Sequence, residues 1–196
     1  MMAAPPTDIR SRRREQTRAE IIAAAWRLAE RDGIAGLSLR DLAVEVGMRA
    51  PSLYTYVANK AAIYDEMFAA GYHELAELMH GVDLDVGDPI GSLEGRFAAF
   101  VAFCQASVPR YQLMFTRAIP DWQPSEAAYA VSVRTYERMA QQLARLGIDD
   151  PKALDLVTAV TAGLAAQQLA NDPDGDRWRR LSREAAEMIL AQTRRM

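Results

Sequence analysis

The sequence lacks the features of a secreted, disulfide-stabilised or membrane-spanning protein. Cys104 is the only cysteine among 196 residues, which excludes an internal disulfide and fits a reducing cytoplasm. The longest uninterrupted apolar run covers residues 97–104, well short of the roughly 20 residues that cross a bilayer. The N-terminal residues reach the arginines at positions 12–14 without an apolar stretch, so we expect no signal peptide. These absences predict a cytoplasmic protein that does not enter a membrane.

Patterns that carry catalysis or hold a cofactor are also missing. There is no Gly-x-Ser-x-Gly motif, the glycines at positions 87, 91 and 95 are not followed by Lys-Ser or Lys-Thr, and the acidic residues of segment 83–88 lack the closing glutamate of a calcium loop. His73, Glu77 and His80 are spaced to share one helix face, where neighbours can pair on a metal, although a simple surface or core cluster is the more common outcome. We expect no enzyme and no cofactor.

The composition indicates a globular chain whose charge is unevenly distributed. Half of the residues are hydrophobic and 25% are charged, which allows a sizeable core. Residues 1–60 carry ten basic and seven acidic side chains, a net charge of +3, which leaves −6 for the remainder. Two interpretations stay open: the basic head contacts a polyanion, or these charges are ordinary solvated helix faces.

Apolar residues recur with the helical period of 3.6, and no segment alternates as a strand does. Ser38 with Asp41 forms a capping box, Asn59 is a second N-cap, and Gly33 can close the first helix in the left-handed conformation. The sequence predicts an all-α fold of about nine helices. They comprise one ending at Asp32 and others near 38–46, 50–57, 60–79, 90–107, 109–117, 125–146, 151–170 and 176–194, with the main loop at 81–91.

Residues 39–58 have the pattern of a helix-turn-helix. The apolar positions expected to hold the two helices together are Leu42, Val46, Met48, Leu53 and Tyr56. Between the helices lies Gly47, where the tight turn requires a positive φ. The alternative is an αα-hairpin that only packs.

If this unit binds DNA, the second helix (residues 50–57) enters the major groove. Arg49 can then contact guanine, Ser52 and Thr55 can donate or accept, and Ala50 or Pro51 can touch a thymine methyl. Arg40 and Lys60 are placed for phosphates. Tyr54 is favoured as a DNA contact, whereas Tyr56 is favoured as part of the hinge core.

Residues 37–60 resemble the signature of the TetR family of transcriptional regulators, most specifically in Ala-Pro-Ser-Leu-Tyr at 50–54 and in Asn59-Lys60. The resemblance is strong over residues 15–70. It implies a DNA-binding domain at 17–62, preceded by a flexible basic arm at 1–16. Ala50 departs from the polar residue often found at that position. The DNA contacts implied by the resemblance are Arg40, Arg49, Ala50, Pro51, Ser52, Tyr54, Thr55, Tyr56 and Lys60.

The resemblance also implies that residues 63–196 bind an effector in a cavity between the fourth and seventh helices. This segment is rich in aromatic residues and methionine, which at helical spacing more often form core than pocket lining. Residues 109–117 resemble one type of C-terminal domain in this family, but the similarity is short. The candidate ligand contacts are Phe100, Phe103, Tyr111, Met114, Phe115, Trp122 and Tyr129.

The last two helices are candidates for a dimer interface. Two such helices per subunit would form a four-helix bundle about a two-fold axis, helped by small residues that allow close approach. The alternative is that they only complete the core of one chain. The candidate interface residues are Leu154, Val157, Val160, Thr161, Leu164, Leu181, Ala185, Met188 and Ile189.

These features predict a homodimeric regulator, most simply a repressor, that binds a palindromic operator in double-stranded DNA and is released by a small hydrophobic effector of unknown identity. The competing hypothesis is a helical small-molecule-binding or interaction protein whose DNA-binding head is vestigial.

Overall fold

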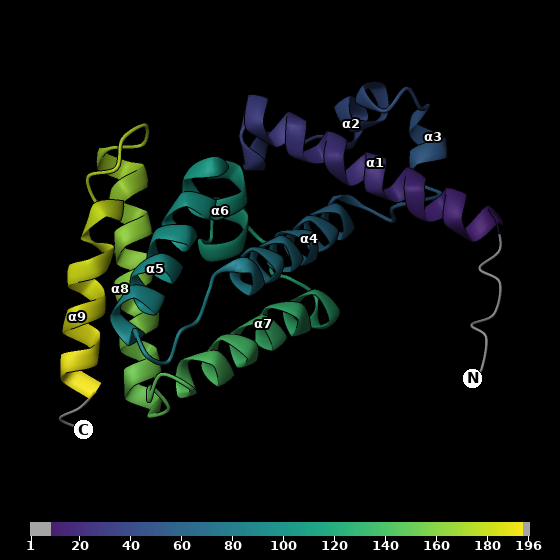
Figure 1. Ribbon diagram of the computed structural model, residues 1–196. Coiled ribbons are helices and arrows are strands. Elements are labelled where there is room, and N and C mark those ends of the chain that lie inside the picture. Colours follow the sequence, from purple (N-terminus) through teal and green to yellow (C-terminus); the bar gives the residue numbers. More distant parts are fainter. Residues whose placement is uncertain (1–8, 194–196) are drawn as a thin grey trace, which may run out of the picture.

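The computed structural model describes residues 9–193, and within that range every regular element is a helix and there is no strand (Figure 1). The all-α prediction is therefore confirmed. Nine α-helices and two short 3-10 helices follow one another over residues 9–193. Their bounds are α1 Ile9–Asp32, η1 Ile34–Gly36, α2 Leu39–Glu45, α3 Ala50–Leu53, α4 Lys60–Gly81, α5 Pro89–Ala106, α6 Val108–Phe115, α7 Glu126–Ala144, α8 Pro151–Asn171, η2 Arg179–Leu181 and α9 Ser182–Thr193.

The predicted helix ends in the N-terminal part are set by local hydrogen bonds and backbone conformation. The Ser38 hydroxyl accepts from the Asp41 N–H at 3.3 Å, and the Asn59 side chain accepts from the Ala62 N–H at 2.9 Å. Gly33 ends α1 with a φ of 78°, and Gly47 makes the turn after α2 with a φ of 66°. Each cap satisfies a backbone group that the helix itself leaves unpaired.

Three predicted boundaries were wrong. The basic segment taken as a flexible arm is helical from Ile9 onward, and its residues 1–8 lie outside the described part. Helix α3 ends at Leu53, and the chain continues to Val57 in hydrogen-bonded turns. The final helix starts at Ser182 rather than near 176, after the 3-10 turn η2.

The buried residues form two hydrophobic clusters, and α4 belongs to both. The first cluster joins α1, α2 and α3 to the N-terminal half of α4, from Ile63 to Phe68, and also takes in Leu113 and Ala128. The second joins α5 to α8 and α9 and includes Leu75 of α4. The predicted DNA-binding domain ends at residue 62, but the first cluster continues along α4 to Phe68. The head and the body therefore share a core along this helix.

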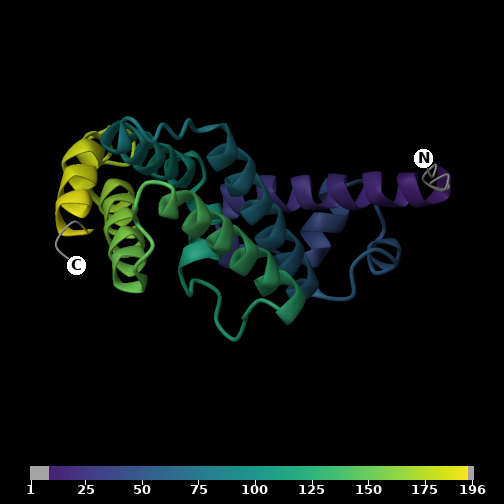
Figure 2. The same cartoon turned by 60° about the horizontal axis from the view of Figure 1, so that its bottom comes forward.

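Helices α8 and α9 lie at the end of the molecule opposite α2 and α3, as both views show (Figures 1 and 2). Four residues predicted for the dimer interface need correction, because the structure buries them in the core of the single chain. They are Val157, Leu164, Ala185 and Ile189. Leu181 and Met188 are exposed, and Leu154, Val160 and Thr161 are half-buried.

By length and composition, α8 is also the one helix among the described residues that could cross a membrane. A count of uninterrupted apolar runs missed it, because polar residues such as Asp155 interrupt the helix. Core helices of soluble proteins pass the same test, so a single helix of this kind is weak evidence for a membrane. Most of its apolar stretch lies on the surface of the single chain, which leaves a face for another partner to cover.

Candidate functional site

The helix-turn-helix in the head is held from behind by α1. Leu42, Ala43 and Leu53 are buried in the same cluster as Ile21 and Leu28 of α1. Arg27 of α1 also pairs with Glu45 of α2 at 3.1 Å. The predicted packing of Leu42 and Leu53 is confirmed, and burying these apolar faces fixes the orientation of α2 and α3.

The structure leaves most of the predicted DNA contacts exposed. Arg40 lies in the first turn of α2, and Arg49 is the residue before α3, with extended backbone. Tyr54 has 54% of its surface exposed, although it follows the buried Leu53 directly. The exposed members of the predicted set are Arg40, Arg49, Ala50, Pro51, Ser52, Tyr54 and Thr55.

The two remaining predicted contacts, Tyr56 and Lys60, are partly buried and have partners within the chain. The Arg14 guanidinium donates to the Thr55 carbonyl at 2.7 Å and lies over the Tyr56 ring, 5.4 Å from its centroid. The Lys60 ammonium donates to the Ala35 carbonyl at 3.3 Å and lies over the Tyr64 ring. Arg14 was missed by the sequence argument, because its contact spans 41 positions along the chain.

Helices α4 and α6 connect the head to the body. The Tyr64 hydroxyl of α4 donates, over 3.0 Å, to the carbonyl of Ile34, a buried residue of the first hydrophobic cluster. At the start of α6, the Ser107 hydroxyl donates to the Glu30 carboxylate of α1, and Leu113 of α6 is buried in the head cluster. These contacts join α4 and α6 to the core of the head.

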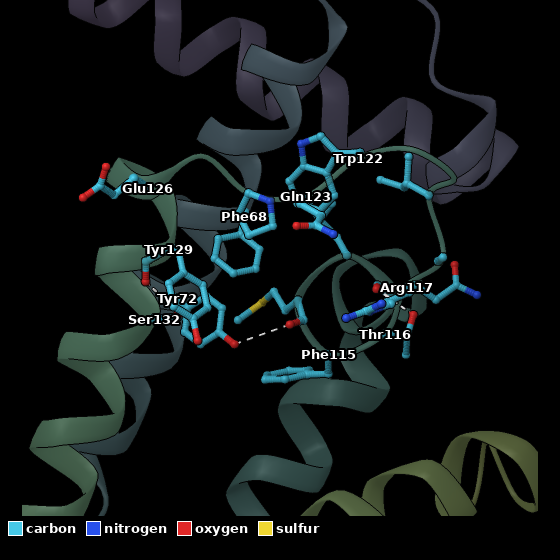
Figure 3. Close-up of a pocket in the computed structure, with 16 residues that line it drawn as sticks. Phe68, Tyr72, Phe115, Thr116, Arg117, Trp122, Gln123, Glu126, Tyr129 and Ser132 are labelled. Carbon is cyan, nitrogen blue, oxygen red and sulfur yellow. Dashed lines mark hydrogen bonds between the residues drawn. The ribbon is translucent and has the colours of Figure 1, made fainter.

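A smaller cavity of about 560 Å³ lies between α4, α7 and the loop that joins α6 to α7. Figure 3 shows its aromatic lining, in which the ring centroids of Phe68 and Trp122 are 6.0 Å apart and those of Tyr72 and Phe115 are 5.9 Å apart. The Tyr72 hydroxyl donates to the Met114 carbonyl at 3.4 Å. The Trp122 indole N–H is buried without a partner among the described residues.

A larger cavity of about 860 Å³ lies in the body, between α4, α5, α6, α7 and α8. The two cavities share four lining residues, Tyr72, Phe115, Tyr129 and Ser132. The wall is aromatic: Phe100 and Phe115 stack edge to face with their centroids 5.3 Å apart, and Tyr111 lies 6.0 Å from Phe115. This volume and apolar lining suit a drug-sized ligand.

Six of the seven predicted ligand residues line one or both cavities. Phe100 and Tyr111 line the larger cavity, Met114 and Trp122 the smaller, and Phe115 and Tyr129 line both. The prediction for Phe103 was wrong, because this side chain lies in the core. The Arg110 guanidinium lies 4.0 Å from the centroid of its ring. A helical pattern cannot tell two inward-facing phenylalanines apart, because which of them meets empty space depends on neighbouring helices.

Burial changes the protonation chemistry of the body. It raises the pKa of Tyr72 to about 12 and that of the Cys104 thiol to about 12, so neither ionises near neutral pH. Burial lowers the pKa of Arg96, a lining residue of the larger cavity that the sequence argument did not single out. His80 and Glu77 also line that cavity, whereas His73 does not.

Comparison with known proteins agrees with this architecture. Residues 21–67 match the family model described as bacterial regulatory proteins, tetR family. A search of the curated proteins found no match.

Among solved structures, the TetR-family transcriptional regulator PfmR from Thermus thermophilus shares 23% identity at a TM-score of 0.64, covering 87% of this chain and 97% of its own. The multidrug binding protein EbrR, complexed with imidazole, shares 22% identity at a TM-score of 0.67. The match covers 95% of this chain and 97% of EbrR. RolR in complex with its ligand resorcinol shares 16% identity at a TM-score of 0.63, and the match covers 94% of each chain. Residues 21–67 therefore match the tetR family of bacterial regulatory proteins, and the chain as a whole has the fold of these solved structures.

Proposed function

We propose that this protein is a homodimeric transcriptional repressor that binds a near-palindromic operator and is released by a small hydrophobic effector. The observation that carries the proposal is the connection along α4 between an exposed helix-turn-helix and a large aromatic cavity. One end of that helix follows α3, and the other lines the cavity with Tyr72 and Leu75.

The head supports DNA binding through what it exposes. Arg49 and Tyr54 project from the two ends of α3, with Ser52 between them, and none of the three is used in the head core. Arginine forks to guanine in the major groove, and hydroxyl groups accept or donate to several bases. Arg40 at the start of α2 adds a cation for a phosphate.

The body supports an effector through its cavities, and α6 supports coupling. Tyr111 and Phe115 of α6 line the larger cavity, while Ser107 and Leu113 of the same helix contact the head. A molecule that binds one arrangement of α6 more tightly shifts the population toward the head position that goes with it. EbrR with imidazole and RolR with resorcinol show that other proteins of this fold hold small molecules.

The surface of α8 supports a second copy of the chain as the partner. Ala159, Ala162, Gly163 and Ala166 are exposed small residues on one helix, and Met188 of α9 is 56% exposed. Two copies joined along α8 and α9 would present two heads, and a two-fold axis would place their half-sites about one helical turn apart.

The test is a mobility shift with the DNA upstream of the protein's own gene at two salt concentrations. We expect specific retention that weakens as salt rises, because phosphate contacts release counterions. The double variant Arg49→Ala, Tyr54→Ala should weaken binding by more than about tenfold, since each lost base contact costs about 1–3 kcal/mol. Circular dichroism should show an unchanged fold.

The matched control is Arg134→Ala, Tyr136→Ala, which removes the same two residue types from exposed positions of α7. We expect it to leave the shift unchanged. If the wild-type chain gives neither specific retention nor salt dependence while still binding small molecules, the vestigial-head hypothesis replaces the repressor.

A further inference from the structure

The larger cavity contains a buried cation without a counter-ion. Arg96 of α5 is only 5% exposed, and it is the one charged side chain that is buried among the described residues. Its Nη2 donates to the Gln142 side-chain oxygen, whereas its Nη1 is buried and has no hydrogen-bond partner in the described part of the chain. Both Arg96 and Gln142 line the cavity.

A buried guanidinium is costly unless an anion faces it. The neighbouring acid on the same helix, Glu94, is already paired with Arg183 at 2.9 Å. No carboxylate of residues 9–193 forms a salt bridge with Arg96. The chain itself therefore does not neutralise this charge, although the side chain is held in place at the cavity wall.

The rest of the lining determines the size and charge of a matching group. The other charged lining residues, Glu77, His80 and Arg138, are exposed, so Arg96 is the only cation buried in the wall. One guanidinium with one free nitrogen suits a singly charged head, because a dianion would need a second buried cation. The aromatic wall of Phe97, Phe100 and Phe115 suits an apolar body.

We infer that the effector is an amphipathic monocarboxylate, whose carboxylate binds Arg96 and whose apolar body lies against the aromatic wall. The inference rests on the proposed function, since it names the chemistry of the effector. A carboxylate would pair with the buried guanidinium in a charge-assisted hydrogen bond of the kind arginine forms best.

Calorimetric titration of the full-length chain with matched pairs of probes tests this inference. The pairs are 1-naphthylacetate with 1-naphthylacetamide, 4-phenylbutyrate with 4-phenylbutanamide, and octanoate with octanamide. Each pair has the same body and differs in the negative charge. In at least one pair we expect the carboxylate to bind the wild type at least about tenfold more tightly than the amide, as a hydrogen bond between charged groups allows.

Arg96→Met removes the charge and keeps a long unbranched side chain. We expect this variant to bind the carboxylate no more tightly than the amide and to melt, without ligand, at or above the wild-type temperature. The melting temperature should not fall, because an unpaired buried charge has been replaced by an apolar group. Arg134→Met is the matched control, with the same charge change at an exposed position of α7 that lines neither cavity, and it should keep the wild-type preference.

Three results would overturn the inference: equal affinity for both members of every pair in the wild type, no binding of any carboxylate, or a carboxylate preference that Arg96→Met retains. The comparison of carboxylate with amide in the wild type needs no variant, so it holds even if Arg96→Met folds poorly. The mobility shift separates the two proposals. Absence of specific DNA binding by the wild type would contradict the repressor proposal. The carboxylate preference is measured independently of DNA, so that result would not affect it.

Discussion

At the residue scale, the head depends on one backbone conformation that most side chains avoid. Gly47 has a φ of 66°, and its N–H bonds to the Val44 carbonyl at 3.0 Å to close the turn between α2 and α3. A Cβ at this position would meet nothing within 4 Å, so a substitution is opposed by the backbone alone. A substitution at Gly47 therefore measures the free-energy cost of the left-handed conformation without a steric clash.

We expect Gly47→Ala to lower the free energy of unfolding by about 1–2 kcal/mol, the cost of a left-handed conformation for a residue with a Cβ. Gly81→Ala is the matched control, because Gly81 also has open space around it but no positive φ. Denaturant unfolding of both variants measures the difference. Equal losses in the two variants would mean that the positive φ does not set the cost.

At the element scale, α4 is the helix on which both parts of the molecule depend. Ile63, Tyr64 and Met67 are buried in the head cluster, and Leu75 is buried in the body cluster. Its first turn is capped by Asn59, which accepts from the Ala62 N–H. Loss of that cap would expose an unpaired donor at the point where the recognition unit joins the helix.

Asn59→Ala should lower the free energy of unfolding by about 1 kcal/mol, the usual cost of losing an N-cap. Asn59→Ser is the control at the same site, because serine caps about as well as asparagine and should retain most of the stability. Thermal and denaturant unfolding monitored by circular dichroism would show the difference. A serine variant as unstable as the alanine variant would contradict a capping role.

At the scale of the whole molecule, the exposed face of α8 is the place where a charge should matter most. A Cβ on Gly163 would meet nothing within 4 Å in the single chain, so a longer side chain there has room in a monomer. In a dimer joined along α8, the same side chain would place a carboxylate in a close helix–helix contact.

If the proposed dimer forms along α8, Gly163→Glu should give a folded monomer in analytical ultracentrifugation and weaken operator binding, because each monomer offers a single head. Ala127→Glu introduces the same charge at an exposed position of α7 and should leave the dimer intact. A monomeric wild type, or a Gly163→Glu variant that stays dimeric, would rule out this face as the interface.

Local patterns in the sequence were sufficient to predict most of the secondary structure. The caps at Ser38 and Asn59, the left-handed Gly33 and Gly47, and the helical spacing of Leu42 and Leu53 each depend on residues within a few positions of one another. Interactions over such short distances are encoded in neighbouring residues, and for that reason the helices and the recognition unit could be predicted.

The cavity and its buried charge were decided only by the tertiary structure. Arg96 looks like any helical arginine in the sequence, and Phe100 and Phe103 look alike, yet one phenylalanine lines a cavity and the other packs in the core. Val157 and Ile189 likewise fit an interface by spacing but lie inside the chain. Whether a side chain is buried depends on which helices pack against it, and those helices are far apart in the sequence.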